Sequence, residues 1–431
     1  MSSKNLYRFL EKGGKLLSTT KISKGIHFHF IESKKFKTTA ITVLLRRQLS
    51  KEEATINAII PSILKRGSAK YFSVSEIHRK TENLYGAIFD AMIMKKGEEQ
   101  VLQFFIEVVK KDKLTEDALE FLKEVILNPL IENGKFDKEI VDGEKANLAK
   151  GIKGRVNDKK EYAKLRCLEE SCTGEPFGIY GDGYLEDIEN LNEKNIYEQY
   201  QKIIQTSPID IIVIGNEDEK ALAQCISLHY GLQREQVQEI NKASAHIKKE
   251  KELIIKETMD VTQGKICMTF RSGIESTGVN FYKLMLMNEL FGGSSNSKLF
   301  SSIREKESLC YNINSLVFRF KTIVFVQSGV EEKNFEKVIE LVKQELKSLS
   351  EKNIQEDEFK NAKKSIINKF KSIEDYSALT MDFYLTQYML NDTDTLEDVQ
   401  QKFAAITMND VADIAKLLYL DTIYLLGKGK S

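Results

Sequence analysis

The stretch LFGGSSNSKLFSSIREKESLCYNINS, residues 290–315, contains a pair of glycines, then a helical pattern, then a strand pattern. The same order occurs in the first half, where LKRGS at residues 64–68 stands in the place of LFGGS, and Gly292 follows Gly67 by 225 residues. Helical patterns begin at Val74 and Ser297, and strand-like alternation follows each of them. The sequence therefore predicts an internal duplication.

Each half also has further strand patterns and long amphipathic helices in a matching order. Residues 25–32 and 38–46 predict strands in the first half, and the apolar run IDIIVIG at residues 209–215 closes it. We predict an α+β fold of two duplicated halves, each a mostly antiparallel sheet with helices packed on one face. The predicted domains are residues 1–230 and 251–431, joined by a polar linker over 231–250.

Composition excludes several classes of function. The 431 residues are 42% hydrophobic, which is enough for large cores, and Lys plus Arg equals Asp plus Glu at 64 each. A chain without net charge has no field to gather nucleic acid or acidic membranes, so neither is an expected partner. The N-terminal segment lacks the continuous apolar run of a secretory signal, and the five cysteines form no paired CxxC clusters. We expect a cytoplasmic protein with reduced thiols.

Four groups of residues around the glycine pair resemble the second-half signature of the pitrilysin/insulinase metallopeptidases, in the branch that includes mitochondrial processing peptidase. They are residues 292–295, 299–300, 303–306 and 309–311. The first half has a family-like loop, GEPFG, at residues 174–178. In detail the chain is most similar to the non-catalytic, YmfF-like bacterial group. The resemblance implies that the two halves face each other like a clam shell and enclose a chamber.

The zinc motif of that family, His-x-x-Glu-His, is missing. Two imidazoles one helical turn apart hold the metal, and the glutamate takes a proton from the metal-bound water. Aligned on residues 64–68, the motif falls on Ala58, Pro61 and Ser62, of which Ala58 has no donor atom and Ser62 is a poor ligand. Pro61 replaces the base, and we expect it to bend or restart the helix. The position of the third ligand falls near 150–151 (Lys-Gly), which has no carboxylate. We predict no metal and no cofactor.

The five histidines offer little in its place. Only His27 and His29 share one face of a predicted strand, so a two-histidine clip is geometrically possible. Without a nearby cysteine or a further ligand cluster, an exposed strand face is the favoured interpretation. His78 is expected to form a solvated pair with Glu82, and His229 and His246 indicate no function.

Arg304 and Tyr311 keep the family spacing, and the resemblance implies that they contact the substrate backbone near the scissile bond. A guanidinium offers several donors to peptide carbonyls, and a phenol can donate to a developing oxyanion. Gly292, Gly293 and Ser294 would form a substrate-facing loop, because glycine permits close approach and unusual dihedrals. The competing interpretation is that Arg304 pairs with a neighbouring carboxylate, Glu305 or Glu307, and that Tyr311 packs in the fold.

Three hypotheses follow. The first is a non-catalytic subunit of a heterodimeric zinc peptidase, inactive by itself, which binds an extended peptide substrate and completes the active site of a zinc-bearing paralogous subunit. The second is a scaffold or binding protein of the same fold that has lost any role in proteolysis. The third is an active hydrolase with an unrecognised site, which would depend on His27 and His29.

Overall fold

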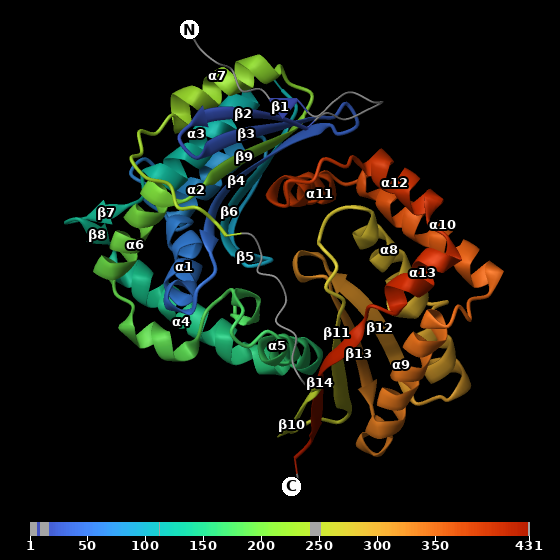
Figure 1. Cartoon of the computed structure of the whole chain (residues 1–431). Helices are drawn as coiled ribbons and strands as arrows, with labels where there is room; N and C mark the ends of the chain where they lie inside the picture. The colour runs from blue at the N-terminus through green and yellow to red at the C-terminus, as the bar shows by residue number, and fades with distance from the viewer. Residues whose placement is uncertain (1–6, 9–16, 112, 242–250, 430–431) are drawn as a thin grey trace. The chain divides into compact units, whose positions relative to one another are not determined.

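The computed structural model describes residues 7–8, 17–111, 113–241 and 251–429 (Figure 1). Most of the predicted linker, 242–250, and with it His246, lies outside the described residues. The chain forms two compact units. The first contains Met1–Lys153, Ile179–Asn241 and Asp375–Leu385, and the second contains Gly154–Gly178, Lys242–Glu374 and Thr386–Ser431.

The first unit is built on a seven-stranded sheet with the order β1-β2-β3-β9-β4-β6-β5. Only the β3–β9 pair is parallel, and every other pair in the sheet is antiparallel. The strands are β1 (Tyr7–Arg8), β2 (Leu17–Ser23), β3 (Ile26–Glu32), β4 (Thr38–Gln48), β5 (Ile88–Lys96), β6 (Glu99–Val109) and β9 (Ile209–Gly215). A separate hairpin pairs β7 (Ile131–Glu132) with β8 (Lys135–Phe136).

Helices cover one face of this sheet, because alternate residues of its strands are apolar. Ile41, Val43 and Leu45 of β4 point into one core with side chains from the helices. The helices of this unit are α1 (Lys51–Leu64), α2 (Val74–Asn83), α3 (Leu114–Leu127), α4 (Lys138–Gly154), α6 (Glu193–Thr206) and α7 (Glu219–Tyr230). Helix α7 was not anticipated in the polar region after β9, and it packs through Leu222, Ile226 and Tyr230.

Helix α1 runs unbroken through Pro61, so the expected restart of the helix is wrong. The Ser50 side chain caps its start by accepting from the Glu53 N–H, and Lys65 N donates to Pro61 O at 3.1 Å just beyond the proline. Pro61 lies in the last turn of the helix and is buried, so packing against the sheet offsets the one backbone hydrogen bond that proline cannot make.

The second unit is built on a five-stranded sheet with the order β10-β14-β11-β13-β12, in which only β10–β14 is parallel. The strands are β10 (Leu253–Met259), β11 (Gly264–Arg271), β12 (Cys310–Phe318), β13 (Ile323–Val330) and β14 (Tyr419–Lys428). Its helices are α5 (Lys159–Ser171), α8 (Val279–Asn288), α9 (Phe335–Ser350), α10 (Glu356–Ile373), α12 (Leu396–Ala405) and α13 (Met408–Ala415), together with two π-helices, η4 (Glu289–Gly293) and η5 (Phe300–Lys306). Helix α11 (Ser377–Met389) is divided between the two units, with its residues up to Leu385 in the first. The predicted α+β class with mostly antiparallel sheets is confirmed.

Helix α5 comes from the first half of the sequence but packs on β11 and β14 of the second sheet (Figure 1). Its C-terminal Ser171 donates through Oγ to Asp421 Oδ2 at 2.8 Å and accepts through its carbonyl from Arg271 Nη2 at 2.7 Å. Arg271 is almost completely buried and also pairs with Glu175, in the GEPFG loop, at 2.8 Å. A buried network therefore holds this segment in the second unit.

The start of α11 makes the opposite exchange. The first unit includes Asp375–Leu385, where Met381 Sδ accepts from Thr42 Oγ1 at 3.6 Å and Asp382 pairs with Lys96. The predicted domains, 1–230 and 251–431, place the α5 segment and the start of α11 each in the other unit. Four of the five cysteines are buried, and Cys225 is partly buried. Within the described residues, no helix combines the length and apolar composition needed to cross a bilayer.

Candidate functional site

The positions of the missing zinc motif lie on α1, and two of the three serve packing. Ala58 and Pro61 are buried in the core of the first unit and carry no metal-binding atom. Ser62 is partly buried and offers only a hydroxyl, which is a weak ligand for Zn²⁺. The side chains of α1 therefore do not fit a zinc ion.

Helix α4 supplies no replacement for the third ligand. Lys150 and Gly151 are exposed, and neither carries a carboxylate. Glu144, near the middle of the same helix, is buried, but its Oε1 accepts from Arg66 Nε at 2.5 Å. Within the described residues, no group of three or more His, Cys, Asp and Glu side chains could hold a metal ion.

His27 and His29 do share one face of β3, but the exposed strand face predicted for them is wrong for His29. The His29 side chain is 2% exposed, and its ring bonds Thr19 Oγ1 through Nδ1 and Asp210 Oδ1 through Nε2, each at 2.9 Å. Asp210 lies on the neighbouring strand β9, which is far from β3 in the sequence and pairs with it in the sheet. The two histidines therefore belong to a buried polar network.

Arg46 completes this network from β4, where its Nε donates to Asp210 Oδ2 at 2.7 Å. Burial alone would raise the pKa of Asp210, but the Arg46 guanidinium and the His29 ring hold that pKa well below its usual range. Burial lowers the pKa of His27, against the attraction of Asp210 at 3.8 Å. The contacts of Asp210 with His29 and Arg46 therefore indicate that the network stabilises the fold.

Arg304 and Tyr311 lie together beside the start of β12. The guanidinium carbon of Arg304 is 4.4 Å from the ring centroid of Phe300 and 5.4 Å from that of Tyr311. Ser308 adopts a left-handed φ of 53°, and Leu309 N donates to Ile303 O at 3.0 Å, so the chain turns back between η5 and β12. This turn places the tyrosine ring over the arginine.

The structure departs from the competing interpretation of this pair. Tyr311 is 82% exposed and does not pack in the fold. Glu307 pairs with Lys337, and among the described residues Arg304 forms no ion pair with a carboxylate. The site therefore presents a stacked arginine whose charge is not neutralised, next to an exposed phenol. Their role in binding substrate stays a prediction.

The backbone of the glycine pair differs from the one expected. Neither Gly292 nor Gly293 has a positive φ, and both lie within η4. A Cβ on Gly292 would lie 2.7 Å from Ser315 Oγ and 2.9 Å from Ser315 N, so the close approach is to β12. Ser294 Oγ donates to the Glu289 carbonyl at 3.4 Å. The expectation of unusual dihedrals is wrong, and Gly292 is needed for close packing between η4 and the sheet. A substrate-facing role of Gly292, Gly293 and Ser294 stays a prediction.

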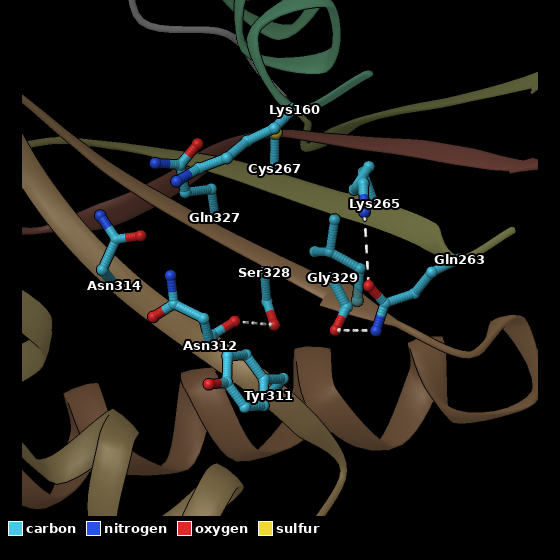
Figure 2. Close-up of a pocket in the computed structure, with 11 residues that line it drawn as sticks. Lys160, Gln263, Lys265, Cys267, Tyr311, Asn312, Asn314, Gln327, Ser328 and Gly329 are labelled. Atoms are coloured by element: carbon cyan, nitrogen blue, oxygen red, sulfur yellow. Dashed lines mark hydrogen bonds between the residues drawn. The ribbon is translucent and has the colours of Figure 1, made fainter. Parts of the chain in front are cut away.

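A pocket of about 140 Å³ opens beside Tyr311 (Figure 2). It lies on the α5 side of the second sheet, over β11, β12 and β13, and Lys160 at the start of α5 reaches into it. Four side-chain amides, two lysine ammonium groups and the Tyr311 phenol line it. The sequence interpretation missed this pocket. The sequence signal for it is the pair Asn312 and Asn314. Because side chains alternate along a strand, residues two positions apart are expected on the same face.

Comparison with known proteins gives a consistent result. The profile of the peptidase M16 inactive domain matches residues 190–366. The probable inactive metalloprotease YmfF of Bacillus subtilis (strain 168) is 29% identical over 408 residues, which cover 93% of this chain and 96% of that protein.

Solved structures agree in fold. A conserved protein from Enterococcus faecalis V583 has a TM-score of 0.90 at 24% identity, covering 97% of this chain and all of that one. A peptidase M16 inactive domain from Pseudomonas fluorescens has a TM-score of 0.79 at 16% identity, covering 96% and 99%. The resemblance to the pitrilysin/insulinase, or M16, peptidases is therefore confirmed.

Proposed function

Because this chain is a homologue of the M16 metallopeptidases that lacks their zinc motif, we propose that it is the non-catalytic subunit of a heterodimeric zinc peptidase. In this role it binds extended peptide substrate and completes the active site of a zinc-bearing paralogue. The observation that carries the proposal is the geometry of Arg304 and Tyr311, in which a cation with no carboxylate partner among the described residues lies against an exposed phenol.

The stacking of Arg304 prepares it for a peptide. The guanidinium lies against the rings of Phe300 and Tyr311, and its N–H groups, which form no ion pair among the described residues, can donate to backbone carbonyls. A guanidinium fixed in this way loses less conformational entropy on binding than a free side chain. The Tyr311 hydroxyl is the second donor, and an oxyanion that forms during peptide cleavage would accept from it.

The position of Tyr311 also suits an extended substrate. Tyr311 lies near the start of β12, and β12 is the last strand in the order of the second sheet, with β13 as its one neighbour among the described strands. Strands at the edge of a sheet can add an extended peptide through main-chain hydrogen bonds. Since neither α1 nor the rest of the described chain offers a metal site, hydrolysis in this proposal belongs to the partner.

The test is to purify the chain with a zinc-bearing paralogue from its native cell and to measure cleavage of a fluorogenic peptide by the mixture. We expect activity from the mixture, none from this chain alone, and a drop of roughly 10²-fold in kcat/KM for Arg304→Ala and Tyr311→Phe. The first substitution removes donors to the substrate backbone, and the second removes a donor to the developing oxyanion. Arg79→Ala is the matched control, since Arg79 is an exposed arginine on α2 that pairs with Glu76.

The outcomes separate the hypotheses. If the mixture cleaves peptide equally well with and without the Arg304 and Tyr311 substitutions, the chain is a scaffold or binding subunit with no part in the composite site. If the chain alone cleaves peptide and loses that activity on substitution of His27 and His29, the hypothesis of an independent hydrolase is correct.

A further inference from the structure

We propose that the pocket beside Tyr311 binds a carboxylate carried by the peptide substrate, either an acidic side chain or the C-terminus of the peptide. This inference rests on the proposed function, because the carboxylate reaches the pocket on a peptide held by Arg304 and Tyr311. Tyr311 belongs to both sites, since its ring stacks on Arg304 and also lines the pocket. A peptide bound by the pair therefore lies within reach of the pocket.

The charge of the pocket favours an anion. Lys160 and Lys265 both line it, and no carboxylate does. Across the described part of the chain, neither lysine forms an ion pair, and Lys265 Nζ donates only to Gln263 Oε1, at 3.4 Å. Asp158, whose charge acts on Lys265, caps α5 by accepting from the N–H groups of Lys160 and Glu161 at 3.0 Å. That carboxylate is already satisfied by the helix.

An anion would stabilise the partly buried ammonium of Lys265 more than it would stabilise a surface lysine. Burial lowers the pKa of Lys265, although Asp158 acts in the opposite direction. A half-buried ammonium without a carboxylate partner has lost part of its hydration and gained little in exchange. A carboxylate in the pocket would replace that hydration.

A nearly buried amide also points into the pocket without a partner. Gln327 on β13 is 8% exposed, and within the described residues its side-chain amide makes no hydrogen bond. Its NH₂ is a donor that a carboxylate can accept from. Lys160 extends from α5 over Gln327, so an ammonium and an amide donor share one space (Figure 2).

The size of the pocket limits the ligand. Pockets for whole cofactors or drug-sized molecules occupy roughly 300–1,000 Å³. At about 140 Å³ this pocket has room for one side chain or one chain end. An acidic side chain or a terminal carboxylate fits both the volume and the charge.

The experiment measures Kd by fluorescence anisotropy for the full chain with three labelled decapeptides. The reference peptide has a central Gln and an amidated C-terminus, the second has Glu in place of Gln, and the third has a free C-terminal carboxylate. We expect the Glu peptide or the free-acid peptide to bind about 10-fold more tightly than the reference, as one favourable charge pair gives. Which of the two shows the preference identifies the source of the carboxylate.

The preference should fall below about 2-fold in Lys160→Met/Lys265→Met and in the single variant Lys160→Met, which changes an exposed side chain and should fold normally. Lys347→Met, at a 74% exposed lysine on α9, should leave it unchanged. An unaltered preference in both pocket variants, equal affinity for all three peptides, or no binding of any of them would overturn the proposal.

Arg304→Ala separates this inference from the proposed function. Loss of binding for all three peptides in Arg304→Ala, with an unaltered charge preference in the pocket variants, would keep the proposed function and reject the pocket. A lysine-dependent preference that survives Arg304→Ala would keep the carboxylate site and reject the role proposed for Arg304.

Discussion

At single residues, the type of side chain limits which functions are possible, and its neighbours in the fold determine which of them it can have. Ala58 and Pro61 exclude a zinc site by chemistry alone, because neither carries an atom that binds a metal. Arg304 could have been neutralised by either neighbouring glutamate, and only the fold shows that it stacks on Phe300 and Tyr311 instead. Prediction was firm where chemistry excluded a role and open where the partner of a side chain mattered.

Gly292→Ala should destabilise the second unit. The added Cβ would meet the Ser315 backbone at 2.9 Å, so we expect a loss of about 1–3 kcal/mol in the free energy of unfolding, measured by urea denaturation. Gly143→Ala is the matched control, since Gly143 is a helical glycine on α4 with no atom within 4 Å of its added Cβ. That control should be neutral or stabilising by up to about 1 kcal/mol. Equal effects of the two substitutions would contradict the packing role.

His27 should make stability depend on pH. Its pKa is lowered in the folded chain by burial, so the unfolded chain binds the proton more readily, and stability is present above the unfolded pKa of about 6.5 and decreases as the pH falls below it. We expect Tm to fall between pH 7.5 and pH 5.5, and to fall less in His27→Gln. Thermal unfolding followed by circular dichroism at both pH values checks this, and parallel curves for the two proteins would count against it.

At the scale of elements, sequence patterns located most strands and helices but not their partners. The strand at 209–215 was recognised from its apolar run, whereas its position between β3 and β4 depends on pairing across the whole first half. Helix α5 was expected among the helices of the first half, yet its contacts are with the second sheet. Local periodicity reports which face of an element is apolar, and it does not report which sheet covers that face.

The buried Glu175 should be essential for holding the α5 segment. Its carboxylate accepts from Arg271 and lies 2.6 Å from Lys321 Nζ, and all three side chains are buried. Glu175→Gln removes the carboxylate nearest to two buried cations, and Arg271 keeps its longer contact with Asp421 at 3.6 Å, so we expect a loss of about 3 kcal/mol in unfolding free energy. Hydrogen exchange should show faster opening of α5 than in the wild type.

The control for this prediction is Glu356→Gln on α10, which breaks a fully exposed pair with Lys360. No measurable change is expected there, because solvent screens exposed ion pairs. Unchanged protection of α5 in Glu175→Gln would show that apolar contacts alone hold the segment.

For the whole molecule, the loss of the zinc site predicts that metal does not contribute to folding. Since the described residues contain no cluster of ligands, the isolated chain should carry less than about 0.1 zinc per molecule by elemental analysis. Treatment with EDTA should shift its Tm by less than about 1 °C, because removal of a structural zinc would lower stability strongly. A stoichiometric metal, or a large fall in Tm, would refute the interpretation of α1 as a degenerate site.

The sequence by itself determined the duplication, the α+β class and the absence of the zinc ligands, because these follow from local periodicity and from the atoms each side chain carries. Only the tertiary structure decided that His29 is buried against Asp210, that Gly292 serves packing, and that the pocket beside Tyr311 gathers amides and lysines from three strands and α5. Burial and pairing depend on segments far apart in the chain, so no window of sequence contains them.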